Sequence, residues 1–299
     1  MANLIDRLFR KIQPAPQKAP ELQTAPLADL QEEEAGREVK IEPPQYVVGL
    51  GQSIGKQRER NEDTLYVLSS MIAGANSTLP FGLFIVADGM GGYENGEVAS
   101  NLAARIMANR LVQTLYLPYF DSKPEKRADP LQEVMQAAFR EANQAVIRLV
   151  PGGGTTLTAA FLLGEQVTLT HVGDSRAYFI YPDGRFKVIT RDHSLVSRLI
   201  ELGQLTEKEA AVHPQRNVLY RAIGQTEPLE PDVNTYPIPH PGFLMLCSDG
   251  LWGNVSEMDL FRVIKEGPTP TIACQKLVEL ANAAGGPDNI SVILVQFLN

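Results

Sequence analysis

Five short segments of this sequence carry carboxylates of the kind that bind divalent cations. The segments are Arg58-Glu-Arg-Asn-Glu62-Asp63, Asp88-Gly89-Met90, Gly173-Asp174-Ser175, Ser248-Asp249-Gly250 and Pro287-Asp288-Asn289. Three of them directly follow an apolar run and place a glycine beside the aspartate. Each such carboxylate is therefore expected at a strand end, on a turn that lets backbone approach a ligand closely. One Asp-Gly pair is an ordinary turn signal, but three strand ends of this kind, with Glu62, Asp63 and Asp288, indicate a shared site.

A cluster of carboxylates predicts bound cations, because like charges repel unless a cation neutralises them. Oxygen ligands without a Cys or His cluster favour Mg²⁺ or Mn²⁺ over zinc. Two such ions about 3.5–4 Å apart can share a hydroxide and contact both oxygens of a phosphoryl displacement. Arg58, four residues before Glu62, has a guanidinium that can bind phosphate through two hydrogen bonds. The alternative for Arg58 is a solvated loop charge beside Lys56 and Arg60.

The elements that must position these residues alternate irregularly, without a βαβ rhythm. Runs rich in β-branched and aromatic residues predict strands at residues 47–53, 64–68, 81–87, 155–163, 166–172, 177–181, 186–189, 243–247 and 290–297. Helical periodicity predicts helices at residues 94–113, 131–149, 195–202, 256–264 and 271–283. Short Gly- and Asp-containing turns between strands predict antiparallel hairpins. Antiparallel strands with a few one-faced helices indicate sheets packed together and covered by helices.

The chain divides by composition into a flexible N-terminal segment and one folded domain. Of its 299 residues, 44% are hydrophobic and 21% charged, which is typical of a globular protein. Residues 1–45 are rich in proline and poor in large apolar residues after Ile12, which is a linker composition. The stripe of apolar residues expected there is a frayed helix on the main domain, formed by Leu4, Ile5, Leu8, Phe9 and Ile12. Docking on a partner or a membrane surface is the alternative. Residues 46–299 are predicted to form a single domain.

Charge and cysteine content exclude several protein classes. A net charge of −8 and a pI near 5.2 argue against nucleic-acid binding. Cys247 and Cys274 each lie in an apolar run, so both are expected as buried free thiols. The opening residues are interrupted by charges, and no run approaches the ~20 apolar residues that a membrane crossing needs. These features predict a cytoplasmic protein without a membrane span.

The acidic segments, taken in order, resemble those of the type 2C family of metal-dependent serine/threonine protein phosphatases (the PPM family), in its bacterial branch. The resemblance covers about residues 46–299 without a missing block. It includes segments without obvious chemistry, such as Thr190-Arg-Asp-His193-Ser194 and His213-Pro-Gln-Arg-Asn217. The resemblance implies an α+β fold, a four-layer α-β-β-α sandwich of two mainly antiparallel sheets flanked by helices. It places the metal cluster between the sheets at one end.

The resemblance also implies a role for the residues around the two core ions, Mn²⁺ or Mg²⁺. Asp88 is expected to bridge both ions, and the Gly89 carbonyl to face one of them. Asp249 and Asp288 are expected to complete the site on one ion.

Four further roles follow from the same resemblance. Glu62 is expected to serve the other core ion, directly or through water, with Asp63 beside it. Arg58 matches the arginine that binds the substrate phosphate. Asp174 matches a residue that holds a weaker third ion together with Asp249. Residues 195–217 correspond to a mobile flap over the active site.

One position departs from the family pattern. Many members have a histidine after the first Asp-Gly, proposed as the general acid, and here that residue is Met90. Methionine cannot donate a proton, so the acid must be metal-bound water or another group. His171 and His193 are the nearest candidates, but a structural role is expected for both. Trp252 is expected to pack as a core or channel-wall aromatic.

The resemblance implies an enzyme that hydrolyses phosphoserine or phosphothreonine in proteins, by direct attack of the metal-bridging hydroxide and without a phosphoenzyme. Its partners would be phosphorylated proteins, the substrates of serine/threonine kinases, and a monomer is favoured. Two alternatives stay open: a catalytically silent regulatory module, and a metal phosphoesterase that acts on small molecules or on one dedicated regulator. Loss of Asp88, Asp249 or Asp288 would have indicated the silent module, and all three are present.

Overall fold

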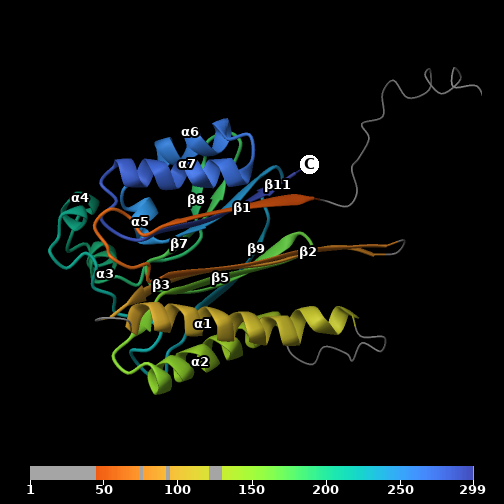
Figure 1. Cartoon of the computed structure of the whole chain (residues 1–299), viewed down its shortest axis with the longest axis horizontal. Helices are drawn as coiled ribbons and strands as arrows, with labels where there is room; N and C mark the ends of the chain where they lie inside the picture. Colours follow the sequence, from red (N-terminus) through yellow and green to blue (C-terminus); the bar gives the residue numbers. More distant parts are fainter. Residues whose placement is uncertain (1–44, 75–76, 92–94, 121–129, 299) are drawn as a thin grey trace, which may run out of the picture. The chain divides into compact units, whose positions relative to one another are not determined.

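The computed structural model describes residues 45–74, 77–91, 95–120 and 130–298. The predictions for the Pro-rich segment concern residues 1–44, which lie outside this part of the chain. Two stacked sheets form the centre, and helices cover their outer faces (Figure 1). Within the same ranges, no helix is long and apolar enough to span a membrane.

The first sheet, as far as the described residues define it, has five strands in the spatial order β1-β11-β10-β7-β8. All of its neighbouring pairs are antiparallel. Its strands are β1 (Tyr46–Ser53), β7 (Arg176–Ile180), β8 (Phe186–Val188), β10 (Gly242–Cys247) and β11 (Ile290–Phe297).

The second sheet has the spatial order β2-β3-β5-β6-β9, with the short strand β4 paired to the end of β3. It is antiparallel as well. Its strands are β2 (Asp63–Gly74), β3 (Ser77–Met90), β4 (Gly154–Thr155), β5 (Leu157–Leu163), β6 (Gln166–Val172) and β9 (Asp232–Pro237).

Two pairs of helices cover the sheets, one pair on each outer face (Figure 1). The pair α1 (Asn95–Leu111) and α2 (Leu131–Leu149) lies on the second sheet, and α6 (Glu257–Glu266) and α7 (Pro270–Ala283) lie on the first. The remaining helical segments are the π-helical turn Val112–Tyr116, the 3₁₀ turn Leu117–Phe120, α3 (Leu195–Glu201), α4 (Glu207–Ala211) and α5 (Asp249–Trp252).

Three apolar cores hold the four layers together. One lies between the second sheet and α1/α2, and includes Leu83, Met107 and Phe139. Another lies between the first sheet and α6/α7. The third lies between the two sheets, where Phe84 and Phe179 are fully or almost fully buried. The predicted α-β-β-α sandwich is therefore confirmed.

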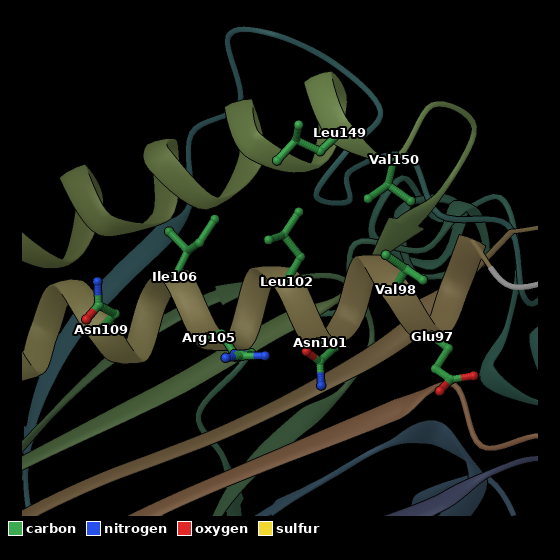
Figure 2. Close-up of a pocket in the computed structure, with 9 residues that line it drawn as sticks. All are labelled: Glu97, Val98, Asn101, Leu102, Arg105, Ile106, Asn109, Leu149 and Val150. Atoms are coloured by element: carbon green, nitrogen blue, oxygen red, sulfur yellow. The ribbon is translucent and has the colours of Figure 1, made fainter.

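The groove between helices α1 and α2 is largely apolar. Figure 2 shows Leu102 and Ile106 of α1 facing the C-terminal part of α2, where Leu149 lies. The charged side chains that line it are Glu97 and Arg105, and Figure 2 shows both on the side of α1 away from α2. This groove does not gather the carboxylates that the sequence singled out.

The structure extends or adds elements that the sequence pattern did not predict. Strands β2 and β3 run past their predicted limits and form one long hairpin. Strand β9 was not predicted. Its sequence, Asp232–Pro237, ends in proline, and its two β-branched residues, Val233 and Thr235, alternate with polar residues. Helix α4 was also missed, although Thr206 and Glu209 form a capping box at its start.

Candidate metal and phosphate site

Strand ends from both sheets bring the acidic segments together. Asp63 at the start of β2 lies directly across from Asp88 near the end of β3. Asp249 follows the end of β10, and Asp288 precedes the start of β11, the strand beside it. Asp174 follows the end of β6. The prediction that these turns share one edge of the fold matches this placement.

Asp88 lies at the centre of the cluster. Burial raises the pKa of Asp88 well above its usual range, and the charges of Asp63, Asp249, Asp174 and Asp288 raise it further, in that order. Burial, followed by the charge of Asp288, raises the pKa of Asp249 to about 6, and hydrogen bonding to Asp88 opposes this rise. The negative charge here therefore lacks a full counter-charge from the protein.

Asp63 is the most enclosed of the neighbouring carboxylates. It is 7% exposed, and the Ser248 hydroxyl donates a 2.9 Å hydrogen bond to its Oδ2. Its Oδ1 has no hydrogen-bond partner among the described residues. Burial raises the pKa of Asp63 to about 7, although hydrogen bonds from Ser291 and Ser248 oppose the shift. An unpartnered buried carboxylate oxygen is costly and fits a site that accepts a cation or a water bound to one.

Arg58 and Glu62 lie on the loop that faces Asp288. Arg58 Nη2 is 2.7 Å from Asp288 Oδ2, and this hydrogen bond raises the pKa of the guanidinium. Burial raises the pKa of Glu62, and the charge of Arg58 opposes that rise. The Glu62 carboxylate lies against Gly96 at the start of α1, where a Cβ would come within 2.4 Å of Glu62 Oε2. Arg58 is therefore placed beside the acidic cluster and not as an isolated solvated charge.

Gly89 allows the backbone around Asp88 to pack tightly. Its N–H donates a 3.1 Å hydrogen bond to the Glu62 carbonyl. A Cβ at Gly89 would lie 2.3 Å from the Gly96 carbonyl oxygen and 2.5 Å from that of Glu62. Only glycine fits there, which explains the glycine directly after Asp88 near the end of β3.

The turn that carries Asp174 is fixed by its neighbours. Asp174 is 8% exposed, and burial followed by the charge of Asp249 raises its pKa well above the usual value. Gly173 before it has φ +109°, and a Cβ there would lie 2.5 Å from Thr156 Cβ. Thr156 Oγ1 accepts a 2.9 Å hydrogen bond from the Asp88 N–H and lies 2.8 Å from Ser175 Oγ. The Asp174 turn and the Asp88 strand therefore share Thr156 as a contact.

Divalent cations fit this donor set. In the ranges that the structure covers, no three Asp, Glu, His or Cys side chains converge into a preformed metal cage. Asp288 is instead paired with Arg58, and Asp63 with Ser248. The available donors are carboxylate and backbone oxygens, which suit Mg²⁺ or Mn²⁺, and the raised pKa values mark charge that a cation would compensate.

The two histidines near the site are structural in this geometry. His193 is 1% exposed; its Nδ1 accepts from the Gly173 N–H at 3.1 Å, and its Nε2 is 3.2 Å from Asp232 Oδ2. His171 is also 1% exposed, and burial lowers its pKa to about 3. Its ring nitrogens contact Thr158 Oγ1 and the Arg191 carbonyl. Neither imidazole is free to protonate a leaving group, in line with the expected structural roles.

Sequence reasoning missed Asn289. Its Oδ1 accepts from the Glu62 N–H at 2.8 Å, and its Nδ2 donates to the carbonyls of Ile54 at 2.9 Å and Arg60 at 2.8 Å. One buried amide therefore ties the loop with Arg58 and Glu62 to the start of β11. The Asp288-Asn289 pair was visible in the sequence, but an amide in a turn carries no signal of the distant loop that it binds.

Comparison with known proteins gives the family. The protein phosphatase 2C model matches residues 49–290. The serine/threonine phosphatase stp of Listeria innocua is 34% identical over 220 residues, which are 72% of this chain and 84% of that protein. Among solved structures, the Mycobacterium tuberculosis serine/threonine phosphatase PstP/Ppp superposes with a TM-score of 0.69 at 32% identity, covering 85% of this chain and 99% of that one.

A second solved structure bears on the metals. The catalytic domain of the serine/threonine protein phosphatase PstP, in complex with 2 manganese ions, has a TM-score of 0.68 and 31% identity, covering 85% of this chain and 99% of that one. The present chain belongs to the protein phosphatase 2C family. The family and fold predicted from the sequence are confirmed.

Proposed function

We infer that this chain is a metal-dependent serine/threonine protein phosphatase. The observation that carries this conclusion is the placement of Asp88 among four other aspartates, at strand ends of two sheets, in a chain of the protein phosphatase 2C family. The enzyme class predicted from the sequence is confirmed by this family and by the relatives named above. Nothing in the site or the relatives favours the catalytically silent alternative.

We propose the following ligands for the ions. Asp88 would hold both core ions, and the Gly89 carbonyl would contribute to one of them. Asp249 and Asp288 complete one core site, and Glu62 serves the other. The central position of Asp88 and the nearness of Asp249 and Asp288 to it support this assignment.

Two further assignments concern the margin of the cluster. Asp63 would contact a core ion, or water bound to it, through Oδ1, the oxygen that does not bind Ser248. Asp174 and Asp249 hold a weaker third ion, an assignment supported by the electrostatic coupling between these two buried carboxylates.

The remaining chemistry belongs to this chain's own residues. When bound, the ions supply Lewis-acid activation of water and charge stabilisation on the phosphoryl group. Arg58 binds the substrate phosphate through its guanidinium fork, which requires that it leave Asp288. The Met90 side chain has no acidic proton to donate. The imidazoles of His171 and His193 are buried and do not face the leaving oxygen. We therefore expect no protein side chain among these three to act as the general acid.

We also propose the biological setting. The substrates are proteins phosphorylated by serine/threonine kinases, and either many such proteins or one dedicated regulator is compatible with the site. The phosphatase domain spans residues 46–299, and residues 195–217 act as its flap. The two buried free thiols, Cys247 and Cys274, support a cytoplasmic setting, and we propose a monomer.

Phosphate release from a phosphothreonine peptide tests the proposed function. The purified full chain is assayed with Mn²⁺, with Mn²⁺ plus excess chelator, and without metal. We expect activity with Mn²⁺ alone. The variant Asp183→Asn changes an exposed aspartate of the β7–β8 turn, so it should behave as wild type. Absence of hydrolysis at every metal concentration, in a folded protein, would contradict the proposal.

A further inference from the structure

The chain's sole tryptophan contacts the backbone of the Asp174 turn. Trp252 lies in α5 (Asp249–Trp252), three residues after Asp249. Its indole Nε1 donates a 3.0 Å hydrogen bond to the Asp174 carbonyl oxygen. This bond joins the loop after β6 in one sheet to the helical turn after β10 in the other. The two aspartates proposed to share the third ion are thus connected through one indole.

The indole itself is held in place by a stacked cation. The guanidinium carbon of Arg176 lies 3.5 Å from the centroid of the Trp252 ring system. Arg176 in turn forms two parallel hydrogen bonds with Asp192, from Nε to Oδ1 at 3.0 Å and from Nη2 to Oδ2 at 2.7 Å. The Asp192 side chain is 10% exposed and that of Arg176 is 26% exposed, so this pair is partly shielded from water. A bidentate pair and a stacked ring leave little rotational freedom to Trp252.

Burial alone does not account for this arrangement. Trp252 is only partly buried, where it packs against the core of α6 and α7. A phenylalanine would supply a similar apolar contact. The feature that phenylalanine lacks is the N–H that binds Asp174, and this bond fixes a carboxylate-bearing turn whose side chain is otherwise repelled by Asp249.

We propose that Trp252 is a positioning residue for the third-ion site, and that its indole N–H sets the spacing between Asp174 and Asp249. The proposal rests on the assignment of these two aspartates in the proposed function. It adds a role to the expected packing of Trp252 against the core, which the structure shows. Outer contacts of this kind typically change metal affinity by roughly 10–100-fold when removed.

Calorimetric titration with Mn²⁺ of wild type and Trp252→Phe tests the proposal without relying on turnover. We expect two tight ions in both proteins, and a weaker third ion whose affinity falls by roughly tenfold in the variant. Tyr236→Phe is the matched control, because it also removes one aromatic donor to a backbone carbonyl, that of Ile189 at 3.3 Å, outside the acidic cluster. It should bind all ions as wild type does.

A second measurement uses the wild-type indole directly. Because Trp252 is the only tryptophan and lies in α5 with Asp249, its fluorescence reports on ions bound near α5; once the tight sites are saturated, the further change on titration with Mg²⁺ reports on the weak site. We expect the change to follow the weak binding phase and to vanish in Asp174→Asn. The proposal is overturned if Trp252→Phe binds the third ion normally, if it loses the tight ions as well, or if the fluorescence change survives in Asp174→Asn. A wild-type protein that binds no Mn²⁺ would instead overturn the proposed function.

Discussion

Arg58 and Asp288 form an ion pair with 2.7 Å between Nη2 and Oδ2, although the proposed function gives each a different ligand. Asp288 is proposed to bind a metal ion, and Arg58 the substrate phosphate. The Arg58 side chain is 49% exposed and that of Asp288 25%, so the pair is open to solvent and weak enough to exchange partners. We interpret the pair as the arrangement that precedes the binding of cation and phosphate.

Replacing Arg58 separates its two contacts. Arg58→Ala removes a positive charge beside the cluster and frees Asp288, so we expect Mn²⁺ to bind roughly 2–10-fold more tightly. The same variant should raise KM for a phosphothreonine peptide by roughly tenfold or more, because the guanidinium fork is lost. Arg58→Lys keeps the charge and should recover part of the KM. Weaker Mn²⁺ binding in Arg58→Ala would contradict this account of the pair.

The left-handed turn before Asp174 gives a second prediction. In Gly173→Ala, the new Cβ would lie 2.5 Å from Thr156 Cβ, and the backbone would keep a φ of +109°, which alanine rarely adopts. We therefore expect a loss of roughly 3 kcal/mol or more in unfolding free energy. Gly203→Ala is the control: Gly203 has φ +69° with no atom within 4 Å of the added carbon, and should cost about 1 kcal/mol. Chemical denaturation measures both. Equal losses would show that contact with Thr156 does not fix this turn.

Local signals were sufficient to predict antiparallel sheets packed together under helices and to single out the acidic segments, whereas the four-layer arrangement was implied by the family resemblance. Apolar strands that end in Asp-Gly mark Asp88 and Asp249, and helical periodicity marks α2. The partners of these residues were not predictable. Asn289 and Glu62 are 227 positions apart, and Trp252 and Asp174 are 78 apart. Such contacts follow from packing two sheets together, which no local pattern of a single sequence encodes.

The buried imidazole of His193 gives a third prediction. His193→Ala should lower turnover less than tenfold, because its ring binds Gly173 and Asp232 and does not face a leaving group. It should still reduce the unfolding free energy by about 2–3 kcal/mol, since the Gly173 N–H and Asp232 lose a buried partner. His240→Ala, at an exposed position, is the control. A thousandfold loss of turnover with unchanged metal affinity would assign a catalytic role to His193.

The raised carboxyl pKa values predict how metal and pH act together on stability. Burial raises the pKa of Asp63 to about 7 and that of Asp249 to about 6, above the unfolded value near 3.8. The folded metal-free protein therefore binds more protons than the unfolded chain between about pH 4 and pH 7, and this contribution to stability is lost as pH rises through that window. Mn²⁺ binds the ionised carboxylates, so it should restore stability mainly at the upper end of this pH window, near pH 7.

Thermal unfolding with and without Mn²⁺ measures this effect. We expect the increase in Tm on adding Mn²⁺ to be several degrees larger at pH 7.5 than at pH 5. Mg²⁺ should show the same trend, whereas K⁺ at equal ionic strength should show none. An increase in Tm that does not depend on pH would indicate that the ions bind away from Asp63 and Asp249.

The central claim is that Asp88 holds the metal ions that catalysis requires. The most direct test is to measure Mn²⁺ binding and turnover in the same preparation of Asp88→Asn. Mn²⁺ binding is measured by calorimetry, and turnover of a phosphothreonine peptide is measured at saturating Mn²⁺. The account predicts that the folded variant loses tight Mn²⁺ binding and retains less than about one hundredth of wild-type turnover. Wild-type turnover and wild-type Mn²⁺ affinity in Asp88→Asn would contradict the assignment of the entire site.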